Sequence, residues 1–418
     1  MAYVERRKSD FRARWKRPDG TYDSKPGFLT EDEALEYGRD QETDVRRGTY
    51  YDKRDGNIVL RQWASEWFEA QDLRGNSTRS YMRRWKPQIA PVWGELTLAH
   101  IAESPLKVKA WEKKLRASVS AATGRQLSKG YADSVVALFR LLLDDAVVEG
   151  LIAASPFPPQ KSRRRGRYER PVTEEKVHAT VEQVIALAEN ARTVWGLSGY
   201  VFILTKAFTG MRLGEMFGLR REYCYPLWPA CDPDPDRAKR KKRIARYGDM
   251  PAIRVQWQYL YEKASDDDPG VPTLLPPKDD SMRTLVVPWF LAELLCDLLD
   301  SHDSEWVFPS LEGSSLLTTG FRTVYWYPIV SGAPARTGRY RRREIPALEE
   351  LEGLVPHGLR HTQKVWLDED DIPRVAAEER MGHLLEGVEG VYSHVTKGME
   401  QRIMRALQER WELAKAAD

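Results

Sequence analysis

Two histidines and an arginine lie within five positions in the stretch "VPHGLRHTQK", in a chain with only seven histidines among 418 residues. His357 and Arg360 are three residues apart, so on a helix they would share one face and could approach a single ligand. Histidine titrates near neutral pH, which suits proton transfer and hydrogen bonding to phosphate. His361, one turn after His357, is expected to support the packing. A zinc site at the two histidines is not expected, because the HExxH glutamate and a convincing third ligand are missing.

Three other stretches hold residue types that could act on the same ligand. In "FTGMRLGEMFGL", Arg212 begins a helix beside Glu215, and in "LPPKDDSMRTLVVP", Lys278 occupies a turn ahead of a strand. The stretch "RMGHLLEGVEGVYSHV" supplies His383 and, nine residues later, Tyr392. Each residue alone would be interpreted as a structural or solvated side chain. Their weight comes from the order in which they follow one another along the chain.

The order arginine, lysine, His-x-x-Arg, Gly-His and tyrosine resembles that of the tyrosine recombinase family, the phage-integrase type of site-specific DNA recombinase, over most of the chain. The interval from His357 to Tyr392 is similar to the family pattern without insertion or deletion. Two positions depart from that pattern. Gly358 stands where the family often has an acidic residue, and Met381 stands where leucine is common.

The resemblance implies strand transfer at one scissile phosphate without a metal ion or other cofactor. Arg212 and Arg360 would neutralise the five-coordinate transition state with planar, bidentate guanidinium groups. Tyr392 would be the nucleophile, giving a 3'-phosphotyrosine and a free 5'-hydroxyl.

The resemblance also implies roles for the remaining site residues. Lys278 would be the general acid that protonates the departing 5' oxygen, His357 the base and His383 a ligand of the phosphate. Glu215, an acid near two arginines, is expected to brace the site rather than react.

The function implied is that of an integrase of a phage or other mobile element, which integrates and excises DNA through a Holliday junction. Its partners would be double-stranded DNA attachment sites, bound by a homotetramer, together with a DNA-bending host factor and an excision factor. The alternatives are a Xer-like chromosome or plasmid resolvase, a relaxing enzyme similar to type IB topoisomerases, and a DNA-binding architectural protein that has lost catalysis.

Composition agrees with a DNA-binding protein outside membranes. No run approaches the roughly 20 apolar residues that a membrane span requires, and the N-terminal stretch lacks the apolar core of a signal peptide. We therefore expect a protein of the bacterial cytoplasm, associated with DNA, whose three cysteines are ordinary thiols. The net charge is only +3, but basic residues cluster at 161–170, 237–246 and 336–343, which favours a nucleic-acid partner.

We predict a multidomain fold that is mainly α with small β-sheets. The predicted order is an arm-type DNA-binding domain of a three-stranded sheet plus helix (1–56), a helical core-binding domain (57–155), a basic linker (156–170), and a mixed α/β tyrosine-recombinase catalytic domain with a C-terminal helix (171–418).

In the first domain, apolar and basic residues alternate with the period of a half-buried strand. The apolar set is Phe11, Ala13 and Trp15; the basic set is Arg12, Arg14 and Lys16. An Asp-Gly hairpin turn follows, and Thr30 with Glu33 forms a capping box that opens a helix over about 31–47. The basic face would be either solvated or inserted in a DNA major groove. Arg163, Arg164 and Arg165 of the linker are further candidate DNA contacts.

The helical domain is predicted from apolar faces such as Leu60, Trp63 and Trp67. In the catalytic domain, strands are expected at 252–260 and 283–288, around a long turn.

Two segments of the catalytic domain leave alternatives open. The 66-residue interval between Arg212 and Lys278 contains an insertion at about 225–250, which is either an extra DNA contact or a mobile loop. The tail has an apolar helix face of Ile403, Leu407 and Trp411. The resemblance implies that this face packs on a neighbouring protomer, and packing within the chain is the alternative.

Overall fold

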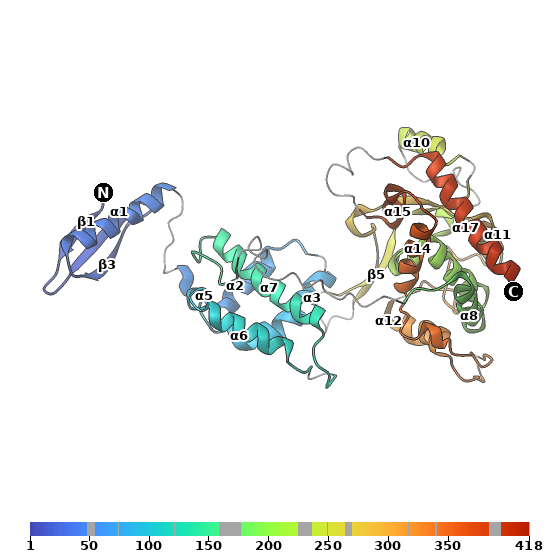
Figure 1. Ribbon diagram of the computed structural model, residues 1–418, viewed down its shortest axis with the longest axis horizontal. Helices are drawn as coiled ribbons and strands as arrows, with labels where there is room; N and C mark the ends of the chain where they lie inside the picture. The colour runs from blue at the N-terminus through green and yellow to red at the C-terminus, as the bar shows by residue number, and fades with distance from the viewer. Residues whose placement is uncertain are drawn as a thin grey trace. The chain divides into compact units, whose positions relative to one another are not determined.

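A computed structural model describes most of the chain (Figure 1). The described residues are 1–47, 55–73, 75–120, 123–158, 177–224, 236–248, 250–263, 270–316, 318–338, 341–383 and 394–417. They contain three separate hydrophobic cores, and each is described below by itself. The chain divides into two compact units, Met1–Arg170 with Lys263–Asp268, and Pro171–Glu262 with Pro269–Asp418.

The N-terminal module has the predicted three-stranded sheet and helix. Strands β1 (Tyr3–Arg6), β2 (Phe11–Lys16) and β3 (Tyr22–Phe28) pair antiparallel in that order, and α1 (Glu31–Arg47) packs against them. Ala13 and Trp15 are buried with Ala34 of the helix, so the predicted alternation along β2 is confirmed. The capping box is also present: the Glu33 amide donates to Thr30 Oγ1 and the Thr30 amide to Glu33 Oε2, at 3.2 and 3.3 Å.

The following segment is helical, as predicted. Its elements are η1 (Asp55–Asn57), α2 (Leu60–Ala70), α3 (Gly75–Arg84), η2 (Trp85–Ile89), α4 (Ala90–Trp93), α5 (Leu98–Ala102), α6 (Pro105–Arg116) and α7 (Lys129–Val148). Leu60, Trp63 and Trp67 are buried in one core. The indole of Trp63 donates to the Leu142 carbonyl at 2.8 Å, which joins α2 to α7.

The second unit combines helices with two small sheets. Its elements are α8 (Val181–Thr209), α9 (Leu213–Phe217), η4 (Arg221–Tyr223), α10 (Arg237–Tyr247), β4 (Ala252–Val255), β5 (Gln258–Glu262), β6 (Val271–Leu275), η5 (Lys278–Asp280), β7 (Arg283–Val286), α11 (Trp289–Asp300), α12 (Thr318–Phe321), η6 (Arg322–Trp326), α13 (Tyr327–Ser331), η7 (Glu349–Leu351), α14 (Gly358–Glu369), α15 (Arg374–Met381) and α17 (Lys397–Ala417).

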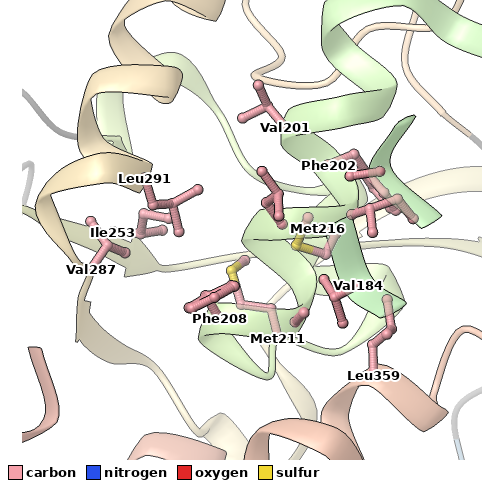
Figure 2. Close-up of a cluster of buried hydrophobic side chains, with 14 of the residues drawn as sticks. Val184, Val201, Phe202, Phe208, Met211, Met216, Ile253, Val287, Leu291 and Leu359 are labelled. Atoms are coloured by element: carbon pink, nitrogen blue, oxygen red, sulfur yellow. The ribbon is translucent and has the colours of Figure 1, made fainter. Parts of the chain in front are cut away.

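Helix α8 runs through the core of this unit. It begins at a capping box of Thr180 and Gln183, and bends at Gly196, whose φ of 65° favours glycine. Around its second half, side chains from α9, β4, α11 and α14 form one apolar cluster (Figure 2). The cluster surrounds the end of α8, where Phe208 and Met211 lie fully buried. This packing fixes the segment that carries Arg212.

The strand prediction needs two corrections. The stretch 252–260 is not one strand: it divides into β4, which pairs with β7, and β5, which pairs with β6. Residues 271–275, predicted as part of a long turn, form β6. This strand contains Pro272 and has no buried residue, so its sequence lacks the apolar pattern of a core strand. Its pairing with β5 makes a two-stranded ribbon.

The expectation that the tail packs on a neighbouring protomer is wrong for its apolar face. Ile403 and Leu407 of α17 are buried in the core of their own unit. Trp411 stacks on Phe290 of α11, with ring centroids 4.0 Å apart and an interplanar angle of 3°. Packing within the chain prevails because α8 and α11 already present an aromatic surface to this face.

Candidate active site

The two predicted arginines come from different helices and converge at the end of α8. Gly210 ends this helix in the left-handed region, with φ of 65°, and Arg212 is the N-cap of α9. Arg360 lies in the first turn of α14, and its Nη1 donates to the Gly210 carbonyl at 2.8 Å. The turn at Gly210 therefore leads into Arg212 and also holds the guanidinium group of Arg360.

Arg212 is held from three directions. Its Nη1 donates to Glu215 Oε1 at 3.0 Å and to Ser281 Oγ at 3.2 Å, and its Nη2 donates to the Gly382 carbonyl at 3.2 Å. The side chain is still 20% exposed. A ligand can therefore meet a guanidinium group whose direction is already fixed.

Glu215 is fully buried and is paired mainly with Arg283, a residue that the sequence analysis did not single out. Arg283 donates to both carboxylate oxygens, at 3.1 and 2.8 Å. Burial alone would raise the pKa of Glu215, but the guanidinium group of Arg283, with help from Arg212, lowers it to about 2. Glu215 is therefore an anion in a fixed position, which is consistent with the bracing role predicted for it.

Arg360 and His383 are also in contact. Arg360 Nη2 lies 3.0 Å from His383 Nε2 and donates to the Met381 carbonyl. Burial, with the positive charges of Arg212 and Arg283, lowers the pKa of Arg360 to about 9, so this group is charged at neutral pH. A guanidinium group can only donate, so Nε2 accepts, and the Nδ1 proton of neutral His383 points to Glu378 Oε2 at 2.7 Å. Glu378 thus fixes one tautomer.

Lys278 lies on an exposed turn, as predicted, at the start of η5. The next two residues, Asp279 and Asp280, have φ of 58° and 49°, a region that aspartate tolerates better than most residues. The turn is linked to the arginine pair through Ser281. Its amide donates to the Lys278 carbonyl at 3.3 Å, and its hydroxyl accepts from Arg212.

His357 precedes the first residue of α14 and is exposed. Its ring packs edge-on against that of His361, with centroids 5.0 Å apart. His357 therefore lies at the same end of α14 as Arg360, and His361 supports its ring, the packing role that the sequence suggests.

The remaining predicted residues lie either outside the described residues or on the N-terminal module. Tyr392 and Arg163, Arg164 and Arg165 lie outside the described residues. Arg12, Arg14 and Lys16 are on β2 of the N-terminal module, where Arg12 and Arg14 both form ion pairs with Glu5. An acid of the neighbouring strand β1 therefore lies against the basic face of β2, which the alternating pattern of β2 does not reveal.

A second set of buried cations holds the end of α8. Lys206, fully buried, donates to the Met211 carbonyl at 2.8 Å, and Arg380 donates to the Phe208 carbonyl at 2.8 Å. Burial lowers the pKa of Lys206 to about 7, with Arg360 acting in the same direction and Glu215 opposing it. These side chains satisfy carbonyl groups that a helix end leaves without partners.

The part of the chain that the structure describes contains no group of three or more histidine, cysteine, aspartate or glutamate side chains arranged to hold a metal ion. Among the same residues, no helix combines the length and the apolar character needed to cross a bilayer.

Comparison with known proteins gives matches among solved structures. The Tn1549 transposon integrase in complex with transposon right end DNA has a TM-score of 0.54 and 16% identity, over 86% of this chain and 100% of that one. The same integrase with circular intermediate DNA has a TM-score of 0.54 and 15% identity, over 82% and 98%. A lambda integrase tetramer bound to a Holliday junction has a TM-score of only 0.45 and 12% identity, over 94% and 97%.

No protein-family profile and no curated protein sequence matches this chain. The identities to solved structures are low, so the comparison bears on fold alone. The chain has the predicted multidomain, mainly helical fold with small antiparallel sheets, and that fold is the one found in the Tn1549 integrase, a tyrosine recombinase.

Proposed function

We propose that the chain is a site-specific DNA recombinase, the integrase of a phage or other mobile element. The observation that carries this proposal is the convergence of Arg212 and Arg360 beside His383, each guanidinium group fixed by backbone carbonyls. Two fixed, planar cations suit a phosphodiester whose negative charge increases in the transition state. The shared fold with the Tn1549 integrase supports the same conclusion.

In the proposed reaction, the hydroxyl oxygen of Tyr392 attacks the scissile phosphorus while His357 accepts its proton. The bond from phosphorus to the 5' oxygen breaks, and Lys278 protonates that oxygen. The product is a 3'-phosphotyrosine beside a free 5'-hydroxyl, so the energy of the phosphodiester bond is retained. Attack by a 5'-hydroxyl from another duplex reverses the step and exchanges the strands.

Arg212, Arg360 and His383 would hold the non-bridging phosphate oxygens during this reaction. His383 has an accepting Nε2 toward Arg360 in the unliganded site, so it must protonate or turn before it donates to phosphate. Glu215 accepts hydrogen bonds from Arg212 and Arg283, so it would hold the start of α9 and the start of β7 together.

The proposal includes the assembly and its setting. A homotetramer would align two double-stranded attachment sites and pass through a Holliday junction, with the N-terminal module and Arg163–Arg165 as further DNA contacts. The chemistry requires no cofactor. A DNA-bending host factor and an excision factor would control direction, and the protein would act in the bacterial cytoplasm on DNA.

A recombination assay tests the proposal. DNA flanking the coding region would be cloned as two candidate sites on one plasmid and treated with the protein, beside Tyr392→Phe. Site-dependent exchange that Tyr392→Phe abolishes supports an integrase. Exchange only between identical sites would favour a Xer-like resolvase, and site-independent relaxation a topoisomerase-like enzyme. Tyr392→Phe behaving like wild type would favour an architectural protein.

A further inference from the structure

Helix α10 lies in the insertion between Arg212 and Lys278 and borders a cavity of about 510 Å³. The cavity lies within the second unit, between α10 and the turn that carries Lys278. Its lining residues come from α10, from β4, from residues 279–284, and from the end of α15 with the two residues that follow it.

Contacts with two other helices hold α10 in place. Arg246 Nη2 donates to Glu379 of α15 and to Glu400 of α17, both at 2.7 Å. Tyr247 is buried at 3% exposure, and α10 lies beside α17 in Figure 1. The helical part of the insertion is therefore packed against the rest of the unit and is not a loosely attached loop.

The cavity shares residues with the candidate active site. Ser281 Oγ and the Gly382 carbonyl accept from Arg212, and His383 Nε2 accepts from Arg360. A group bound in the cavity would therefore lie next to a phosphate held by the two arginines.

The charge of the cavity is divided between its two sides. Arg283 is neutralised by Glu215, and Arg246 by the two glutamates that it contacts. Lys242 and Arg243 add positive charge from α10, and Arg254 adds another from β4, where it is paired with Thr284 of β7.

The opposite rim holds the carboxylates of Asp279 and Asp280. An anion would therefore bind against α10. Thr284, only 6% exposed, also lines the cavity, and its hydroxyl has no hydrogen-bond partner among the described residues.

We propose that the basic lining of this cavity, Lys242 and Arg243 of α10 with Arg254 of β4, binds a phosphodiester of the DNA backbone adjacent to the scissile phosphate. The inference rests on the proposed function and extends it to a second, non-reacting phosphate. A lysine amine beside arginine forks is a suitable receptor for such a group, because it attracts any phosphate oxygen without a strict geometry.

Lys242 and Lys241 provide a matched pair for the test. Both are exposed residues of α10 with the same charge, but only Lys242 lines the cavity. The full chain and the variants Lys242→Ala and Lys241→Ala would be titrated with a short DNA duplex of arbitrary sequence over a range of salt concentrations. Asp280→Asn would be included as a variant of the opposite rim.

A plot of log K against log salt has a negative slope. Lys242→Ala should make this slope shallower by about 0.9, because one fewer counterion is released, and Lys241→Ala should leave it unchanged. Asp280→Asn should tighten binding. Equal slopes for the two lysine variants would overturn the proposed site, because they would mean that DNA responds to the overall positive charge of α10 and not to a contact at Lys242. Weaker binding by Asp280→Asn would overturn it as well.

Failure of the proposed function would give a different result. A Lys242-specific slope change without any Tyr392-dependent covalent adduct would support the DNA contact and reject the recombinase. A Tyr392-dependent adduct together with equal salt slopes for the two lysine variants would support the recombinase and reject the DNA contact at Lys242. A wild-type chain that binds no duplex at all would overturn both.

Discussion

Arg283 and Glu215 form a buried, two-bonded ion pair beneath Arg212, with side-chain exposures of 5% and 0%. The carboxylate also accepts from the amide and side chain of Arg212. One acid thus connects a buried cation with a partly exposed one. This pair explains how a guanidinium group at the start of a short helix can keep a fixed direction without a ligand.

Glu215→Gln should destabilise the second unit by about 3–5 kcal/mol, because it leaves the buried Arg283 without its counter-charge. Urea unfolding followed by tryptophan fluorescence would measure the loss. Glu189→Gln is the matched control, since Glu189 pairs with Arg192 in an exposed position and should contribute less than about 1 kcal/mol. Similar effects of the two substitutions would contradict the structural role of Glu215.

Lys206→Met should remove a pH dependence of stability. The pKa of Lys206 is about 7 in the folded chain, against 10.5 as its ordinary value. Between these values the unfolded chain holds a proton that the folded chain lacks, so the stability of the wild type rises with pH. The difference between wild type and variant should change by about 1.4 kcal/mol per pH unit over this window. A pH-independent difference would show that Lys206 titrates normally.

The contacts of His383 predict that its neutral form carries the proton on Nδ1. The nitrogen chemical shifts of labelled histidine would identify this tautomer, with exposed His178 as the reference for a ring in water. Glu378→Leu should remove the preference, because it deletes the acceptor of that proton. A wild-type His383 protonated on Nε2 would contradict the hydrogen bond with Arg360.

Trp411→Ala should destabilise the second unit by about 3 kcal/mol, because it removes the ring stacked on Phe290. Leu413→Ala, at a neighbouring residue that is 71% exposed, should change stability by less than about 0.5 kcal/mol. The comparison is made by urea unfolding at low protein concentration, where subunits are apart. An effect of Trp411→Ala that appears only in an assembled form would instead favour packing between protomers.

Much of the fold could be predicted from local sequence. The alternation in β2, the capping boxes at Thr30 and Thr180, and the apolar faces of α2 and α7 all depend on residues close together in the chain. The edge ribbon of β5 and β6 could not be predicted, because Pro272 and its exposed neighbours lack a core pattern. Whether the tail packs within the chain or on another protomer depends on its contact with α11, more than 100 residues away. The periodicity of apolar residues within the tail cannot indicate such a distant partner.

The candidate site shows the same limit. Arg212, Lys278, Arg360 and His383 could be found because their types and order follow a recognisable pattern. Arg283 could not, since its partner Glu215 is 68 residues away and the surrounding "RTLVVP" suggests only a strand.

Covalent trapping would show whether Tyr392 is the nucleophile: nicked duplexes of the flanking DNA are mixed with the protein in the absence of divalent metal. A cut strand cannot be rejoined once its short fragment has diffused away, so the adduct accumulates. We expect a protein–DNA adduct on denaturing gels for the wild type and none for Tyr392→Phe, with the DNA attached to a peptide through Tyr392. Duplex that the protein binds without forming an adduct, or an adduct that persists in Tyr392→Phe, would contradict this expectation.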